Sequence, residues 1–241
     1  MTSSVAMAAS AAVAGPLTGP PRPVEVVTVT PHAVYLATGD PDCPALCLAT
    51  PTAVRVPCAV VVGRLPTGTS TGTVGAGTLS LQGFQGRVAR WWRSPRPRDV
   101  VPPGYPPFVS GPVTDLVEAL VENRPLIPPV RRLIGRGPGL TPYYDDVLAG
   151  LLVTLAALGS PKLQPLGAAV RVLAPTRTTF VSAALLHHAA RGECIPELTA
   201  FLNGEPDALR NVGHTSGAGL AEGVRAATAV QAMQAAQAVQ A

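Results

Sequence analysis

The sequence has few charged residues, few aromatic residues and few cysteines. Of its 241 residues, 13% are charged and 4% are aromatic, whereas 47% are hydrophobic. This balance excludes a charge-rich disordered protein and predicts a chain that buries a core. The 24 glycines and 27 prolines follow no collagen-like triplet, so they predict many turns and loops.

Positive charge is also scarce, and almost all of it is arginine. The net charge is +4, and Lys162 is the only lysine in the chain. A nucleic-acid-binding protein usually concentrates more positive charge than this. One stretch, at 85–98, interleaves arginines with two tryptophans, a pattern that can bind nucleic acid. We interpret it as a solvated helix end or a contact with another subunit, and predict no nucleic-acid partner.

The four cysteines do not form a disulfide framework in a chain of this length. Three residues separate Cys43 from Cys47, which is not the usual spacing of a metal-binding pair, and no second pair follows at zinc-finger spacing. We therefore expect reduced thiols in a cytoplasmic protein. No uninterrupted apolar run approaches about twenty residues, so the sequence predicts no membrane span.

Composition and hydrophobic period divide the chain into segments. At the start we expect a disordered Ala/Pro-rich leader rather than a secretory signal, because no basic residue precedes Arg22. At the end, Ala/Gln repeats predict a frayed helix with little functional content. The predicted segments are a leader at 1–23, a β-rich domain at 24–94, a Pro-rich linker at 95–110, a helical domain at 111–225 and a tail at 226–241.

The predicted fold class is α+β. Short strands about ten residues apart favour a small antiparallel sandwich or barrel in the first domain. The expected strands are 24–30, 33–37, 45–49, 53–56, 58–62 and 73–81. After the linker the apolar residues recur at helical spacing, so no strand is expected between 145 and 225. The expected helices are one that begins near Pro112, then 128–134, 143–158, 179–191, 195–203 and 218–239.

A glycine-rich loop precedes the most apolar of these helices. It reads Gly-Arg-Gly-Pro-Gly-Leu-Thr-Pro at 135–142. Thr141 suits the N-cap and Pro142 the first helical position. Gly137 and Gly139 let a ligand approach the backbone, and a helix N-terminus offers N–H groups to an anion. No lysine follows, so the loop is not a Walker A motif.

Two acids complicate anion binding at this loop. Asp145 and Asp146 would repel a phosphate placed against them, and they suit an amide donor or a cation better. Alternatively, they only stabilise the helix N-terminus. The residues alone leave both interpretations open.

A second loop carries a histidine between glycines. Gly213 and Gly217 bracket His214, Thr215 and Ser216. Ser216 can cap the helix that follows, and His214 can donate to a carbonyl or carry a proton near neutral pH. The alternative is a loop histidine that only bonds to nearby backbone.

Between the two loops lies a hydroxyl-rich helix start. Arg177 can pair with a carboxylate or a phosphate. Thr179 and Ser182 suit ligand contacts and helix caps equally well. The histidines at 187–188 are expected on a helix surface, and Glu193 is expected only to mark the helix exit.

These motifs together resemble one bacterial family. The first loop with Asp145-Asp146, then Ser-Ala-Ala-Leu-Leu at 182–186 with Arg-Gly-Glu at 191–193, then Gly-His-Thr-Ser-Gly at 213–217, are similar to the AllH-type subunit of oxamate carbamoyltransferase. The resemblance extends over about 24–225. It implies exchange of a carbamoyl group between oxamate or oxalurate and phosphate, in allantoin catabolism, within a complex of several subunits.

The resemblance has two departures, and both fall in these motifs. Tyr143 and Tyr144 stand where the family usually has Ser-Gly, and Gly219 stands where an Asp is common. Bulky phenols could narrow a pocket, and loss of an acid could alter activity.

We infer roles for the residues of the two loops and the helix start between them. A small carboxylate or carbamoyl phosphate is the expected ligand, and no cofactor or metal is predicted, although the Asp pair could hold a divalent cation. The alternative is a non-catalytic anion-binding or scaffold subunit. The candidate catalytic residues are His214, Asp145 and Asp146; the candidate substrate-binding residues are Gly137, Gly139, Thr141, Arg177, Thr179, Ser182, Gly213, Thr215, Ser216 and Gly217.

Overall fold

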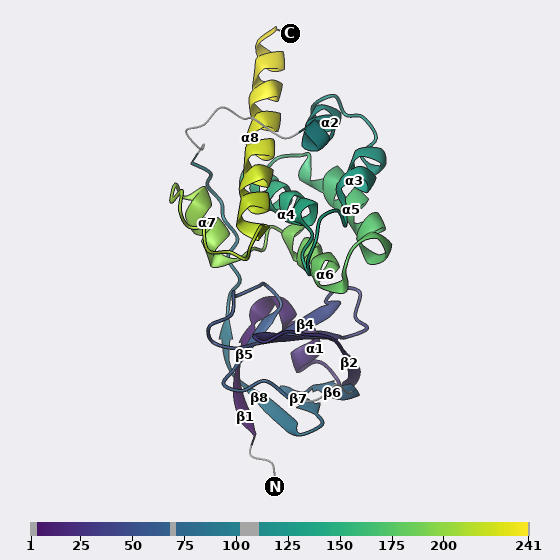
Figure 1. Cartoon of the computed structure of the whole chain (residues 1–241), viewed down its shortest axis with the longest axis vertical. Helices are drawn as coiled ribbons and strands as arrows, with labels where there is room; N and C mark the ends of the chain where they lie inside the picture. The colour runs from purple at the N-terminus through teal and green to yellow at the C-terminus, as the bar shows by residue number, and fades with distance from the viewer. Residues whose placement is uncertain (1–3, 68–70, 102–110, 241) are drawn as a thin grey trace. The chain divides into compact units, whose positions relative to one another are not determined.

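The computed structural model describes residues 4–67, 71–101 and 111–240. It divides the chain into two compact units, Met1–Ser94 and Pro95–Ala241. Strands form most of the first unit and helices the second (Figure 1), which confirms the α+β class. Within the described residues, none of the helices has both the length and the apolarity needed to cross a membrane.

The first unit is a closed eight-stranded barrel. Of the two predicted architectures, the barrel is therefore the right one. Around the barrel the strands follow the order β1-β5-β4-β3-β2-β6-β7-β8. Their bounds are β1 Val5–Ser10, β2 Arg22–Val29, β3 Ala33–Ala37, β4 Ala45–Ala49, β5 Ala59–Val62, β6 Thr71–Gly75, β7 Thr78–Leu81 and β8 Phe84–Trp92.

The predicted disordered leader is wrong, because its residues close the barrel. Strand β1 lies between β5 and β8, and a short 3-10 helix at Ala11–Val13 and helix α1 at Ala14–Thr18 follow it. Met7 and Ala9 are almost completely buried. Three of the six residues of β1 are alanine, so the alternation of side chains along the strand was hidden in a composition typical of low complexity.

The expectation of a purely antiparallel sheet is also wrong. Strand β1 runs parallel to β8, and β4 runs parallel to β5, while the other neighbours are antiparallel. The first parallel pair arises because the N-terminal strand inserts beside the last one. Parallel neighbours need a longer connection than a two-residue hairpin, and the segment between β4 and β5 provides it.

Three further predictions differ from the structure. Residues 53–56 form no strand, and the arginine-rich stretch at 85–98 begins in strand β8 rather than in a helix. The expected single strand at 73–81 is the hairpin β6–β7. Its turn residues Ala76 and Gly77 have φ of 51° and 78°, as a two-residue type I′ turn requires. An alanine at φ > 0 gives no turn signal in the sequence.

The second unit is helical, as predicted, and 145–225 contains no strand. One helix was missed, α5, because Pro165 and Pro175 interrupt its pattern. Pro165 lies in the first turn, where a missing N–H costs little. The described helices are α2 Gly111–Val121, α3 Ile127–Leu133, α4 Tyr143–Ala157, α5 Leu163–Arg177, α6 Phe180–Ala189, α7 Pro196–Leu202 and α8 Ser216–Gln240.

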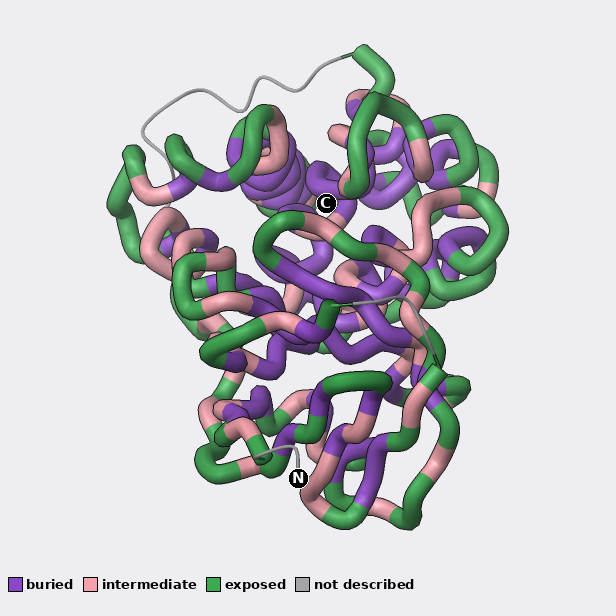
Figure 2. The backbone as a smooth tube through the Cα atoms, turned by 60° about the horizontal axis from the view of Figure 1, so that its bottom comes forward, coloured by how far each residue is buried: buried purple, intermediate pink, exposed green. Residues whose placement is uncertain are grey.

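Helices α4 and α8 pack with their backbones close together. A Cβ atom at Gly150 would lie 2.3 Å from the carbonyl oxygen of Leu220, and one at Gly223 would lie 2.2 Å from that of Val147. Helix α4 is buried almost all round, as its sequence predicted. Figure 2 shows buried backbone (purple) in both units. The tail is more than a frayed end, because α8 stays packed as far as Val230.

The described part of the predicted linker is bonded to the helical unit. The N–H of Cys194 donates to the carbonyl of Pro95 at 3.1 Å, and the N–H of Val101 donates to that of Leu202 at 2.8 Å. Residues 95–101 therefore belong to the second unit. The rest of the predicted linker, 102–110, lies outside the described residues.

Candidate functional site

The two glycine-bracketed loops lie against each other at the starts of α4 and α8. The hydroxyl oxygens of Thr141 and Ser216 are 3.0 Å apart, although 75 positions separate them in sequence. The start of α6 joins them, because the hydroxyl of Thr179 donates to the carbonyl of Leu140 at 2.6 Å. We call this meeting point of the α4, α6 and α8 starts the loop junction.

Glycine is required in the first loop because the backbone passes close to its neighbours. Gly135 has φ +75°, and a Cβ there would lie 1.9 Å from the carbonyl oxygen of Arg177. Gly137 has φ +117°, and a Cβ there would lie 2.7 Å from the nitrogen of Tyr143. Gly139 also has positive φ, at +97°, but faces open space. The first two glycines thus allow the loop to fold onto the starts and ends of neighbouring helices.

The predicted N-cap role of Thr141 is wrong. Helix α4 begins at Tyr143, with Pro142 at the N-cap position and no side-chain cap bond. The carbonyl of Pro142 accepts the N–H of Asp145 at 2.9 Å. Because Pro142 takes the cap position, the Thr141 hydroxyl is left to bond to the hydroxyl of Ser216.

Both carboxylate oxygens of Asp145 accept hydrogen bonds from the chain itself. Its side chain is 1% exposed. Oδ1 accepts the backbone N–H of Gly135 at 2.7 Å, and Oδ2 accepts the hydroxyl of Ser182 at 2.7 Å and also that of Thr178. One carboxylate thereby joins the first loop, the end of α5 and the start of α6. This arrangement assembles the loop junction and leaves Asp145 little capacity for a ligand.

Asp146 differs from its neighbour in one respect that matters for chemistry. Its side chain is 7% exposed, and its Oδ2 is buried with no hydrogen-bond partner. Burial raises the pKa of Asp146 to about 7; the nearby charge of Asp145 adds to this rise, and hydrogen bonds from Ser216 and Thr141 oppose it. A buried carboxyl that titrates near neutral pH can accept or donate a proton under ordinary conditions.

The two departures from the family pattern lie next to each other. A Cβ at Gly219 would lie 2.8 Å from the carbonyl oxygen of Tyr143 and 2.9 Å from the Cβ of Asp146. The phenol of Tyr143 donates to Oε2 of Glu222, a buried residue. Burial, followed by this contact, raises the pKa of Tyr143. The missing side chain at 219 therefore accommodates the tyrosine-containing start of α4.

The second loop places its histidine at the surface. His214 is exposed, Thr215 and Ser216 are half-buried, and Gly217 is buried. Gly213 has φ +59°, and a Cβ at Gly217 would lie 2.0 Å from the carbonyl oxygen of Leu209. The structure thus brings Ser216 to the loop junction and leaves His214 on the exposed part of the loop.

The hydroxyl-rich segment is used mainly for capping. Thr179 is the N-cap of α6, and its hydroxyl accepts the N–H of Ser182 at 3.0 Å. The side chain of Arg177 is exposed, while its backbone lies beside Gly135. The hydroxyl of Thr178 donates to Asp145, although Thr178 was not among the predicted site residues. Its position among other hydroxyl residues is the sequence feature that could have indicated this role.

Two predictions are wrong: His188 does not lie on a helix surface, and Glu193 does more than mark a helix exit. His188 is 1% exposed, and its Nδ1 is 2.6 Å from Oε2 of Glu193. Oε1 of Glu193 accepts from Arg96. Burial raises the pKa of Glu193, but hydrogen bonds and charge from His188 and Arg96 outweigh burial and hold it below its usual value. These three residues bond the segment at 95–101 to α6.

The residues that the structure describes include no group of three His, Cys, Asp or Glu placed to hold a metal ion. The Asp145–Asp146 pair thus offers two carboxyls, one of which the chain already occupies. All four cysteines are buried. Burial raises the pKa of Cys47 to about 12 and that of Cys194 to about 11, which disfavours the reactive thiolate.

Comparison with known families agrees with the resemblance derived from the motifs. Residues 133–228 match the model of the family described as oxamate carbamoyltransferase subunit AllH. The resemblance is therefore confirmed over a segment that contains the loop junction and every candidate site residue. No solved structure matches the chain significantly.

Proposed function

We propose that this chain, which is similar to the AllH subunit family over 133–228, is a non-autonomous subunit of an oxamate carbamoyltransferase complex. The observation that carries the proposal is the coincidence of the matched segment with the loop junction. The three motifs of the resemblance are separated in sequence, yet Asp145, Thr141 and Ser216 connect them through hydrogen bonds. The partners are other subunits of the same transferase.

The proposed reaction moves a carbamoyl group between two acceptors. In one direction, phosphate attacks the ureido carbonyl of oxalurate, the bond from that carbon to the oxamate nitrogen breaks, and the nitrogen takes a proton. The products are carbamoyl phosphate and oxamate. The reverse direction forms oxalurate and phosphate.

The residues of the loop junction suit different parts of this task. The exposed donor His214 would polarise the carbamoyl carbonyl, where negative charge develops only in the transition state. Gly137, Gly139 and the exposed Arg177 would bind the anionic part of the ligand. Asp145 would hold the loops in place, and Asp146, with its pKa near 7, would bond to an amide or exchange a proton.

A second candidate function is a non-catalytic anion-binding or scaffold subunit of the same complex. The observation that favours it is the structural use of several candidate residues. The hydroxyl of Thr179 caps α6. The hydroxyl of Ser182 donates to Asp145, and neither contact needs a ligand.

The test is phosphorolysis of oxalurate by the chain assembled with its partner subunits. We expect His214→Ala to lower turnover by about a hundred- to a thousandfold, the usual cost of removing a transition-state donor. His32→Ala is the matched control, because His32 is also an exposed histidine but belongs to the barrel. It should leave turnover unchanged.

Two results would overturn parts of this proposal. If His214→Ala keeps near-full turnover in an intact complex, the catalytic role is wrong and the scaffold function is favoured. If the wild-type complex catalyses no carbamoyl exchange, the transferase function itself is wrong.

A further inference from the structure

We propose that Oδ2 of Asp146 is a specificity-determining acceptor that binds the amide or ureido N–H of the ligand and rejects a carboxylate in the same position. This inference rests on the proposed function and assigns one part of the substrate to one atom of the site. It predicts that the loop junction distinguishes oxamate from oxalate, which carries a second carboxylate in place of the amide.

The unpartnered state of Oδ2 is the first observation behind this assignment. Buried polar atoms are normally hydrogen-bonded, and each exception needs a physical explanation. The neighbouring polar groups are engaged with other partners: both oxygens of Asp145 accept from the chain, and the hydroxyls of Thr141 and Ser216 lie 3.0 Å from each other. The chain thus surrounds Oδ2 with polar groups and supplies no donor to it.

The charge at the start of α4 determines which ligand group fits. A helix N-terminus by itself attracts anions. Here the two acids of the first turn are both buried, so a phosphate or carboxylate oxygen at Oδ2 would meet two carboxyls. A neutral N–H donor gains a bond to a charged acceptor instead, which is stronger than a bond between neutral groups.

A ligand can reach Oδ2 only if groups around it move. The atom itself has no exposed surface, but residues 136–140 of the first loop and 213–214 of the second are exposed. The contact between Thr141 and Ser216 links the two loops. Opening of that contact exchanges one hydroxyl bond for a bond to the ligand, and glycines flank it on both loops.

The experiment measures the affinities of the purified full-length chain for oxamate and for oxalate by calorimetry at pH 8. A hydrogen bond to a charged group contributes about 1.5–3 kcal/mol, so the wild-type chain should bind oxamate roughly ten- to a hundredfold more tightly. Asp146→Asn should reduce this preference to less than about threefold, because its amide can donate to a carboxylate. Asp115→Asn, which alters an exposed acid on α2, should keep the wild-type preference.

The wild-type measurement alone can overturn the proposal, whether or not a variant folds. The proposal is wrong if the chain binds the two ligands equally, if it prefers oxalate, or if it binds neither ligand when its partner subunits are also present. A folded Asp146→Asn chain that keeps the full preference for oxamate also overturns it. A chain that distinguishes the ligands in a complex without transferase activity would contradict the proposed function and leave this assignment intact.

Discussion

The barrel and the helical unit differ in what they bury. Among the described residues of the barrel, the buried side chains with polar or ionisable groups are Ser10, Thr38, Tyr35, Cys43, Cys47 and Cys58, which are all neutral at ordinary pH. In the helical unit they include six acidic, basic or histidine residues: Asp145, Asp146, Lys162, His188, Glu193 and Glu222. Burying an ionisable group is costly unless it is paired. The buried acidic and basic residues therefore lie in the helical unit, and the described part of the barrel buries none.

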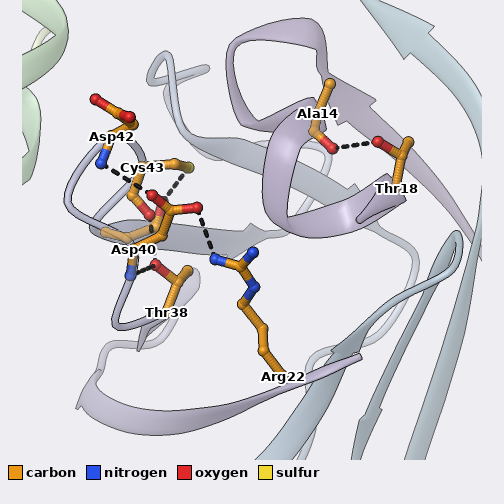
Figure 3. A network of polar contacts seen from close by, with 8 residues as sticks. Ala14, Thr18, Arg22, Thr38, Asp40, Asp42 and Cys43 are labelled. Carbon is orange, nitrogen blue, oxygen red and sulfur yellow. Dashed lines mark hydrogen bonds and ion pairs between the residues drawn. The ribbon is translucent and has the colours of Figure 1, made fainter. Parts of the chain in front are cut away.

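Charges in the barrel pair closer to the surface. Arg22 and Asp40 form an ion pair at 2.7 Å with side chains 31% and 19% exposed, and Asp40 also accepts the N–H of Asp42 (Figure 3). The hydroxyl of Thr38 accepts the N–H of Asp40 in the same turn. These contacts fix the turn between β3 and β4. Partly exposed pairs of this kind contribute little to stability.

The largest expected effect is a loss of stability when a side chain is added between α4 and α8. Gly150→Ala places a Cβ against the backbone of Leu220, and backbone cannot move aside as a flexible side chain can. Overpacking typically costs about 1–3 kcal/mol. We expect the upper end, which corresponds to a Tm lower by about 6–12 °C for a chain of this size. Differential scanning calorimetry measures it.

Gly15→Ala is the matched control from the barrel unit. Gly15 lies in α1, and a Cβ there meets nothing within 4 Å. Alanine is the better helix former, so this change should leave Tm equal or slightly higher. Equal losses for the two variants would contradict the close packing of α4 against α8.

The next effect compares two aspartates that each accept both a side-chain donor and a backbone N–H. Asp145→Ala leaves the Gly135 N–H and the hydroxyls of Thr178 and Ser182 without their acceptor, at a cost of about 2 kcal/mol or more. Asp40→Ala removes a half-exposed contact and should cost less than about 1 kcal/mol. Urea denaturation of both variants gives the two values, and a larger loss at Asp40 would reverse the comparison.

A further expected effect is a pH-dependent gain of stability. Because the pKa of Asp146 rises to about 7 in the folded protein, the folded state binds a proton more tightly than the unfolded state. Stability contributed by the protonated carboxyl is present at low pH and is lost as pH rises from about 4 through 7. Asp146→Asn removes this titration. Its Tm should therefore exceed the wild-type Tm by more at pH 8 than at pH 4.5, and an equal difference at both would contradict the raised pKa.

Patterns of side-chain type predicted the helices and the loop junction better than they predicted the barrel. Apolar residues at helical spacing located α2, α3, α4, α6, α7 and α8, and the glycine motifs marked the two loops that meet at the loop junction. The prediction of a disordered leader was wrong because half of the residues of β1 are alanine, and alanine does not mark a strand in the sequence. The predictions for His188 and Glu193 were wrong because Glu193 also pairs with Arg96, 97 positions away in sequence. No local pattern indicates such a contact.

The role of Asp146 could be predicted only in part. Adjacent acids at a helix start indicated a binding or stabilising pair, but no feature of the sequence distinguished the role of one acid from that of the other. The difference between them comes from three-dimensional neighbours: Gly135, Thr178 and Ser182 occupy Asp145, whereas Oδ2 of Asp146 has no partner.

The most direct measurement of the central claim is the kcat/KM for phosphorolysis of oxalurate by the assembled complex, with Asp146→Asn compared with Asp40→Asn. If the chemistry resides at the loop junction, Asp146→Asn should lower kcat/KM by about tenfold or more, and Asp40→Asn in the barrel should leave it within about twofold of wild type. Full activity of the Asp146→Asn complex, or an equal loss in the Asp40→Asn complex, would contradict the claim.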